Sequence, residues 1–374
     1  MASNWFEQHP RITIVGVLLV GFLMLDVLFA NMYKLIAGHP WAQDFVSIER
    51  QYRVPSDIYH NDLAEKVMVD NVRWGFLTYK VRTNSLGFRD RTTRDVALVT
   101  DKPRIVFMGD SFTEGIGYDY EHTFVGRIDS VLAAQGIEVL NAACIGYSPI
   151  VYWRKTKHLI EDVGLRFDEM VVFLDVSDVW DEVNQYYLDD SLKVRGKADS
   201  AFWEALNKYE RSLSEIIRRN TILSITILSE IRRLWYLIDK EQIYAIDAKK
   251  STWTIRDEDY LAYGKQGLEK MKLYMDKLYD LLTAHRVKLT VVVHPWPDQI
   301  YYGDFMSIHV SFWKKWCEER QVKFLDCFPY FMKGFSTEER LQVIDNYYIR
   351  YDAHFNERGH HLMADVFLDH YGIN

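Results

Sequence analysis

Short apolar runs alternate with longer stretches of helical periodicity between residues 101 and 374. Apolar runs of this length are typical of strands that are buried on both faces. We expect strands at 104–109, 137–141, 170–175, 289–293 and 322–326, and helices at 122–135, 150–162, 257–285 and 307–320. Strands that alternate with helices form a parallel sheet with helices on both faces, connected by right-handed crossovers. The pattern therefore predicts an α/β protein, a flavodoxin-like three-layer α/β/α sandwich.

The N-terminal region is different, because residues 12–36 are almost entirely apolar. About 20 such residues are enough to span a bilayer as a helix. We interpret the stretch as a transmembrane anchor. A cleavable signal peptide is the alternative, but a strongly basic preceding region and a clean small-x-small cleavage site are both missing. Asp26 lies within the stretch, where a carboxylate needs water, the interface or a partner helix.

These patterns divide the chain into regions. We expect a short tail at 1–11, the anchor at 12–36, a membrane-proximal lead-in at 37–100 and a catalytic domain at 101–374. A helical insert at about 183–256 interrupts that domain. Within it, residues 220–238 are unusually apolar but carry charges, which predicts an amphipathic helix. This helix either caps the sandwich or lies against a membrane or a partner.

Composition excludes some functions. The net charge is −8 and no run is rich in lysine or arginine, which argues against nucleic-acid binding. Three cysteines form neither a disulfide framework nor a Cys-x-x-Cys metal pair. His360 and His361 point about 100° apart on a helix, so they do not form a metal site with His354. We therefore expect no metal and no other cofactor.

Two separate segments carry candidate chemistry. A Gly-Asp-Ser turn directly follows the strand predicted at 104–109, and such a turn exposes the hydroxyl of Ser111 at the edge of the sheet. Near the C-terminus, Asp352 and His354 are two residues apart, so an extended segment places both on one side. Asn356 is a typical N-cap for the final helix. The pattern suggests a serine nucleophile with a His–Asp pair as its base.

These segments resemble the sequence blocks of the SGNH (GDSL-type) hydrolase superfamily. Residues 109–111 match the serine block, 141–148 are similar to the glycine block, and Asp352 with His354 match the late block. The resemblance implies that Ser111 is the nucleophile, that His354 is the base oriented by Asp352, and that the N–H groups of Ser111 and Gly146 form the oxyanion hole.

The asparagine block differs from the superfamily pattern. Where the family has Gly-x-Asn-Asp, this chain reads Asp-Val-Ser-Asp at 175–178, so Ser177 occupies the asparagine position. Its rotatable hydroxyl is a candidate third donor to the oxyanion. Asp178, His294 and Trp296 also follow predicted strands and are candidates for substrate contact. The alternative for Asp178 is that it belongs to a solvated acidic loop. The alternative for His294 is that it is a loop histidine hydrogen-bonded to the backbone.

A narrower resemblance concerns the substrate. The single anchor, the segment Arg-Thr-Asn-Ser-Leu-Gly-Phe-Arg-Asp at 82–90 and the Asp-x-His spacing resemble membrane-anchored SGNH proteins associated with exopolysaccharide O-acetylation. This implies an esterase or O-acyltransferase that acts on acyl groups, mainly acetyl, of cell-envelope or secreted polysaccharide. It also implies a membrane-bound O-acyltransferase as partner. The alternative is a non-catalytic carbohydrate-binding or scaffold protein that partners such an acyltransferase.

Charge and resemblance disagree on membrane orientation. Arg11 precedes the anchor, whereas Lys34, Arg50 and Arg53 follow it, and this count favours a cytoplasmic C-terminal domain. The resemblance implies a single-pass inner-membrane protein with its catalytic domain on the periplasmic side. Because large domains are translocated largely regardless of charge, we adopt the second orientation.

Overall fold

The computed structural model describes residues 5–38, 41, 45–197, 202–238, 248–334 and 336–373. The chain forms two compact units. One contains Met1–Arg50 and Ala205–Lys240, and the other contains Gln51–Glu204 and Glu241–Asn374. After the predictions from the sequence, we call the first the membrane unit and the second the catalytic unit.

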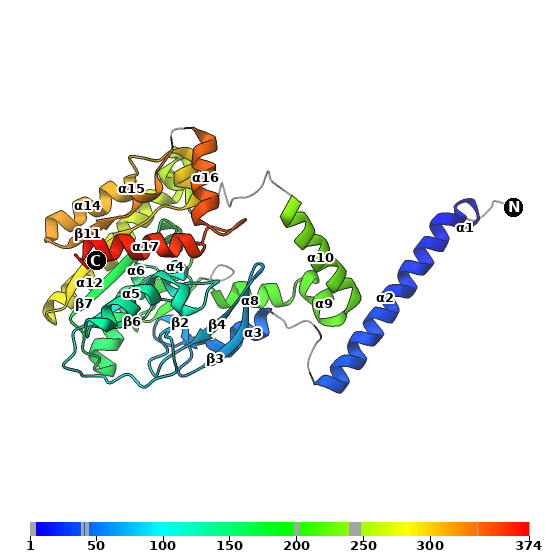
Figure 1. The fold of residues 1–374 in the computed structure, drawn as a ribbon, viewed down its shortest axis with the longest axis horizontal. Helices are drawn as coiled ribbons and strands as arrows, with labels where there is room; N and C mark the ends of the chain where they lie inside the picture. Colours follow the sequence, from blue (N-terminus) through cyan, green and yellow to red (C-terminus); the bar gives the residue numbers. More distant parts are fainter. Residues whose placement is uncertain are drawn as a thin grey trace. The chain divides into compact units, whose positions relative to one another are not determined.

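The catalytic unit is built on a five-stranded parallel sheet in the order β11-β10-β7-β5-β6 (Figure 1). Its strands are β5 (Arg104–Met108), β6 (Glu138–Asn141), β7 (Glu169–Leu174), β10 (Lys288–Val293) and β11 (Lys323–Asp326). Each boundary lies within one residue of the prediction. The order is that of a flavodoxin-like sheet, so the predicted fold is confirmed.

Helices cover both faces of this sheet. On one face, α5 (Phe124–Ala134) and α17 (Glu357–His370) pack on a buried cluster that includes Phe107 and Phe173. On the other face, α6 (Pro149–Lys157) packs against α12 (Lys265–Ala284), and Thr156 of α6 contacts Met170 of β7. Adjacent strand residues point to opposite faces, which explains why the central residues of the strands are mostly apolar on both faces.

The other elements of this unit are short or peripheral. They are α4 (Ser111–Glu114), α7 (Asp178–Asn184), α11 (Asp257–Asp259), α13 (Pro297–Tyr302), α14 (Ile308–Arg320), α15 (Phe328–Phe331), α16 (Thr337–Tyr347) and the antiparallel pair β8 (Tyr186–Leu188) and β9 (Val194–Gly196). The helices predicted at 150–162 and 257–285 each contain a π-helical turn, at His158–Val163 and Tyr260–Gly264.

Residues 51–100 are more than the lead-in that we expected, because they belong to the catalytic unit. They form two antiparallel hairpins, β1 (Arg53–Ser56) with β2 (His60–Leu63), and β3 (Met68–Trp74) with β4 (Leu77–Arg82). Beyond β4, the Arg89 N–H donates to the carbonyl of Asn141, at the end of β6. The buried guanidinium of Arg89 also donates to the carbonyls of Glu114 and Gly115, directly after the predicted nucleophile.

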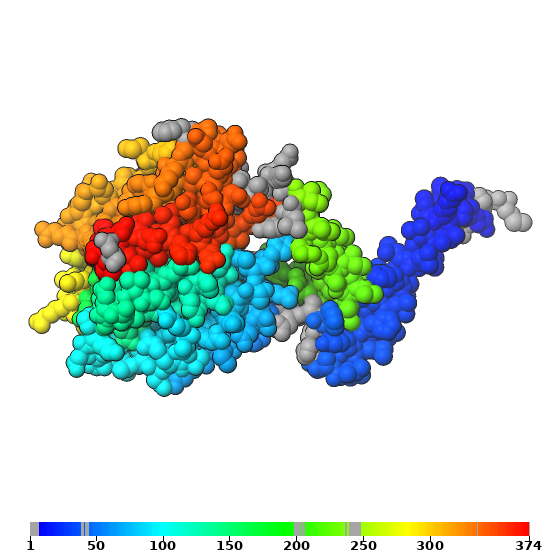
Figure 2. Space-filling model, viewed as in Figure 1, coloured from blue at the N-terminus to red at the C-terminus, as the bar shows by residue number. Residues whose placement is uncertain are grey.

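The membrane unit contains α2 (Pro10–Ala37), the one described helix that is long and apolar enough to cross a membrane, with a mean hydropathy of 2.6. Most of its apolar side chains are exposed, and the space-filling view shows them as the blue helix (Figure 2). The unit also holds α9 (Leu213–Asn220), α10 (Leu223–Ile238) and most of α3 (Phe45–Tyr52) and α8 (Phe202–Glu210).

The expected helix at 220–238 is present as α10, and residues 205–240 form a compact unit with α2. The insert predicted at about 183–256 is thus divided, and its two flanks remain in the catalytic unit.

Candidate active site

The Gly-Asp-Ser turn is fixed by local contacts at the carboxyl end of β5. Asp110 caps α4, because its Oδ1 accepts from the N–H of Phe112 at 3.0 Å. A Cβ atom at Gly109 would lie 2.2 Å from Oγ1 of Thr113, so only glycine fits there. The turn makes Ser111 the first residue of α4, as the sequence suggests.

Ser111, His354 and Asp352 form one hydrogen-bonded chain. The Nε2 atom of His354 is 2.8 Å from Oγ of Ser111, and its Nδ1 atom is 2.5 Å from Oδ1 of Asp352. These partners assign Nδ1–H as donor to the carboxylate and leave Nε2 to accept from the serine hydroxyl. Asn356 caps α17 by accepting from Arg358 and Gly359, which fixes the loop that precedes it. The distances are those of a nucleophile with its base and orienting carboxylate.

The electrostatics of this chain suit proton transfer. Burial lowers the pKa of His354, but the charge and hydrogen bond of Asp352 outweigh it, so the pKa is raised above its usual value. Burial raises the pKa of Asp352, but the hydrogen bonds and charge of His354 and the N–H of Trp74 lower it overall. Asp352 is therefore ionised when His354 takes a proton, and it stabilises the imidazolium.

Trp74 is a site residue that sequence reasoning missed. Its Nε1–H donates to Oδ2 of Asp352 at 2.7 Å, and its ring meets the His354 ring edge-on at a centroid distance of 5.3 Å. Trp74 is the last residue of β3, 278 positions from Asp352. No local pattern indicates this pairing, since it depends on where the β3–β4 hairpin packs. Trp74 positions the carboxylate that positions the base.

We expect Trp74→Phe to lower kcat by roughly tenfold to a hundredfold, the equivalent of one hydrogen bond to a charged group. The phenyl ring keeps most of the packing, and KM should change little because Trp74 acts through Asp352. Steady-state kinetics on an aryl acetate measure both constants. Trp316→Phe is the matched control, since Trp316 donates to Asp276 in another part of the unit. Equal losses in both variants would contradict the role of Trp74.

The predicted oxyanion donors follow three neighbouring strands, β7, β5 and β6. In the described part of the chain, neither the N–H of Ser111 nor that of Gly146 donates to another residue. Gly146 has a φ of 73°, and its carbonyl accepts from the hydroxyl of Tyr186 at 2.7 Å. The side chain of Ser177 makes no hydrogen bond to a described residue, whereas its N–H donates to Asp175. These groups are available to an oxyanion.

If the Ser177 hydroxyl contributes to the oxyanion hole, Ser177→Ala should lower kcat by about a hundredfold with little change in KM. The reason is that this hydrogen bond forms mainly in the transition state. Comparison of kcat and KM for the two proteins is the measurement. Equal rates would remove Ser177 from the site, while Ser177→Asn, if the larger side chain fits, should keep the activity or raise it.

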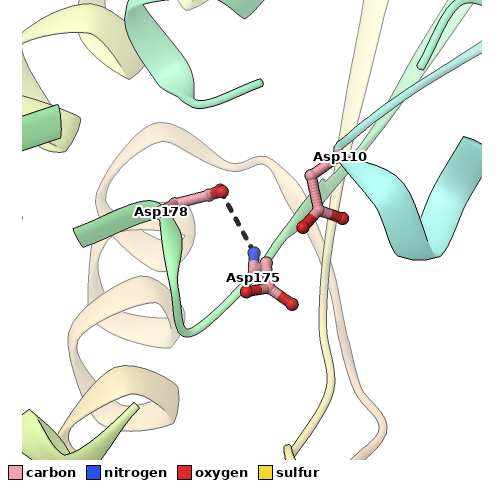
Figure 3. Close-up of side chains that lie close together, drawn as sticks. All are labelled: Asp110, Asp175 and Asp178. Atoms are coloured by element: carbon pink, nitrogen blue, oxygen red, sulfur yellow. Dashed lines mark hydrogen bonds between the residues drawn. The ribbon is translucent and has the colours of Figure 1, made fainter. Parts of the chain in front are cut away.

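Three buried carboxyl groups lie together beside the serine turn. One oxygen from each of Asp110, Asp175 and Asp178 lies within 4.8 Å of the others, and Figure 3 shows the three side chains converging. Oxygen ligands of this kind suit Mg²⁺ or Ca²⁺, and this is the group of described residues that could hold a cation. Burial and the charge of Asp175 raise the pKa of Asp110 and Asp178 well above the usual carboxyl range. Their neutral forms are therefore stabilised relative to those of ordinary carboxyl groups.

Two of the predicted substrate contacts are buried in the structure. Asp178 and His294 are 0% and 1% exposed. His294 packs on the Phe112 ring, with Nε2 3.7 Å from Oδ2 of Asp175. Trp296 is partly exposed and donates to Asp175 at 2.7 Å, so it remains a candidate for substrate contact. The alternative of a solvated acidic loop is wrong, since Asp175 is 0% exposed.

The serine, the glycine block and the Asp-x-His loop thus occupy the places in an α/β/α sandwich that the sequence blocks predict. The catalytic unit has the predicted flavodoxin-like α/β/α fold, and its candidate triad is placed as in the SGNH hydrolases that the sequence blocks resemble. This is evident from the strand order of the sheet and from the distances that join Ser111, His354 and Asp352.

Comparisons with known proteins give distant likenesses only. No family model matches the sequence, and a search of curated proteins gives no match. Among solved structures, the chain is similar to an acetylxylan esterase from Geobacillus stearothermophilus (13% identity, TM-score 0.38, covering 74% of this chain and 98% of that chain). It is also similar to an esterase from Pseudoalteromonas sp. (12%, 0.35, 72% and 96%) and a GDSL-like lipase from Bacteroides thetaiotaomicron (11%, 0.38, 73% and 90%).

Proposed function

We propose that this protein is a membrane-anchored SGNH-type serine esterase or O-acyltransferase that acts on acyl groups, mainly acetyl, of cell-envelope or secreted polysaccharide. One observation carries the ester chemistry: His354 joins the Ser111 hydroxyl to the Asp352 carboxylate at 2.8 and 2.5 Å. An imidazole held in this way can remove the serine proton as the oxygen attacks a carbonyl. The polysaccharide and the acyl group are inferred from the sequence resemblance.

The proposed reaction has two halves. Oγ of Ser111 attacks the acyl carbonyl while its proton passes to Nε2 of His354, and the N–H groups of Ser111 and Gly146 stabilise the oxyanion. The tetrahedral intermediate expels the sugar oxygen, which takes the proton from His354. In the second half, His354 removes a proton from water or from another sugar hydroxyl, which attacks the acyl-enzyme and regenerates Ser111. Water gives an esterase, and a sugar hydroxyl gives a transferase.

Reaction of Ser111 with a serine-directed phosphonate tests the proposal. Mass spectrometry of the labelled full-length protein should locate the adduct on the Ser111 peptide, and Ser111→Ala should show none. Incubation with an aryl acetate, with and without an acetyl-free oligosaccharide, then separates free acetate from acetylated sugar. Transfer to the sugar identifies a transferase.

The alternative is a non-catalytic carbohydrate-binding or scaffold protein that partners a membrane-bound O-acyltransferase. The serine at the usual asparagine position favours it, because the oxyanion hole then lacks the side-chain amide donor of an asparagine. A folded protein whose Ser111 does not react, and which still binds the oligosaccharide, would establish this alternative and overturn the esterase.

The proposed orientation places the catalytic unit outside the cytoplasm, with a membrane-bound O-acyltransferase as the acyl source for a transferase. The length and hydropathy of α2 support the anchor, and the sequence resemblance supports the side. Reporters that are active on only one side of the membrane, fused after Asn374, test the orientation. A signal from the cytoplasmic reporter alone would overturn it.

A further inference from the structure

Asp26 of α2 caps another helix of the membrane unit. Its carboxylate accepts hydrogen bonds from the backbone N–H groups of Ile222 and Leu223 at 2.8 Å and of Ser224 at 2.7 Å. These donors lie at the start of α10, where N–H groups have no partner within their own helix. Asp26 is 1% exposed, so the protein covers its carboxylate almost completely and shields it from solvent or lipid. A carboxylate at a helix N-terminus is also stabilised by the helix dipole.

This cap fixes the depth at which α10 begins. The hydrocarbon core of a bilayer is spanned by about 20 helical residues. Because α2 covers Pro10–Ala37, any stretch of about 20 residues within it includes residue 26. If α2 spans the membrane, Asp26 therefore lies within the hydrocarbon layer, and the three N–H groups that bind it lie at the same depth. The start of α10 is then inside the bilayer.

The exposed surface of α10 matches such a location. Its large apolar side chains that are at least half exposed are Leu223, Ile227, Leu228, Ile231, Leu234, Trp235 and Ile238. At about 100° per residue, they occupy one continuous arc of roughly 140°. Outside this arc lie Arg232, Ile225, Ser229 and Arg233, and Arg233 is paired to Glu230 at 2.8 Å. An apolar arc opposite basic residues is typical of a helix at a membrane interface.

We propose that α10 is a membrane-embedded interfacial helix, pinned to the transmembrane helix by Asp26, with its apolar arc in contact with lipid acyl chains. With 16 residues, α10 rises about 24 Å, which is too short to span a bilayer. We assign lipid to this arc because the Asp26 contact holds the start of α10 against the helix that spans the membrane. The chain thus enters the membrane twice, once in α2 and again in the middle of the catalytic sequence. The inference rests on the proposed membrane anchoring and not on the ester chemistry.

Site-directed spin labelling of the full chain in lipid nanodiscs tests this helix. The three native cysteines are buried, so the unsubstituted protein measures background labelling. Nitroxides at Ile231→Cys, on the apolar arc, and at Arg233→Cys, on the opposite side, report collisions with apolar oxygen and with a water-soluble nickel chelate. We expect the oxygen-to-nickel accessibility ratio to be about tenfold higher at position 231 than at 233. High nickel accessibility at both positions, or protection of position 231 from both reagents, would overturn contact with lipid.

Substitution of Asp26 tests the pin. In Asp26→Leu, α2 should still insert, because leucine is favourable in lipid, while the oxygen-to-nickel ratio at position 231 should fall severalfold. Asp26→Asn keeps an acceptor oxygen and should retain most of the ratio. An unchanged ratio in Asp26→Leu would overturn the pin. Membrane retention in alkaline carbonate and turnover of an aryl acetate, measured on the same samples, distinguish failure of this inference from loss of the anchor or of the enzyme.

Discussion

Ser111→Ala and His354→Ala are each expected to reduce turnover of an aryl acetate by roughly a hundred-thousandfold or more. Both residues act in the same proton transfer, because Oγ of Ser111 can attack only as Nε2 of His354 receives its proton. Removal of either one disables the whole unit. The double variant should therefore be scarcely slower than either single variant, rather than showing the product of two losses.

Kinetics of purified full-length protein, with enough enzyme to measure the residual rate, provide this comparison. Ser311→Ala is a matched control, because Ser311 is an exposed serine of α14 whose hydroxyl bonds only within its own helix. It should keep the full rate. If Ser111→Ala keeps more than a small fraction of the activity, Ser111 is not the nucleophile and the proposed reaction is wrong.

The sheet and its helices could be predicted because their signals are local. Each buried strand is a short apolar run such as Arg104–Met108, and each covering helix shows its own periodicity. The serine turn was predictable for the same reason, since it directly follows a strand. The partnership of Ser111 with His354, 243 positions away, was inferred from the family resemblance and from the order of strands.

Features that depend on long-range packing could not be predicted. The hairpins of residues 53–82 mix polar and apolar residues without regular alternation, and β3 has a register shift between Val69 and Val72. The sequence therefore predicted only a connector there, and it did not indicate the contact of Trp74 with Asp352. From the sequence, the acidic residues at 175–182 were equally compatible with a solvated loop and with a substrate-contacting role. Burial of Asp175 and Asp178 depends on the Trp296 and Tyr152 side chains that donate to them.

The apolar insert is the most instructive case. Periodicity of residues 220–238 correctly indicated an amphipathic helix, but periodicity says nothing about which surface it faces. In the sequence, Asp26 is an isolated carboxylate in the anchor, and the first N–H groups of α10 have no acceptor within their own helix. Their contact in the structure accounts for both features. The N–H groups at the start of α10 donate to the carboxylate of Asp26, and the carboxylate provides the acceptor that these groups need.

Asp352→Asn is expected to lower kcat by about ten-thousandfold while leaving the fold intact. The neutral amide of asparagine offers no negative charge to stabilise the imidazolium of His354. Its N–H group can instead donate to Nδ1, which favours the tautomer with the proton on Nε2. That tautomer presents a proton, rather than a lone pair, to Ser111. Asp345→Asn, an exposed change near the same loop, is the matched control and should keep the full rate.

The same variant should also change the pH dependence, and the sign follows from the pKa of His354. In the native protein Asp352 raises this pKa, and His354 acts as a base only when neutral, so kcat/KM should fall as the pH drops through a value above about 6.5. Without the carboxylate charge, the pKa of His354 should fall, because Asp352 is the largest of the groups that raise it. The acid limb of kcat/KM should therefore move to lower pH, and NMR titration of the His354 ring should move with it. An acid limb that stays in place would show that Asp352 does not control the charge of His354.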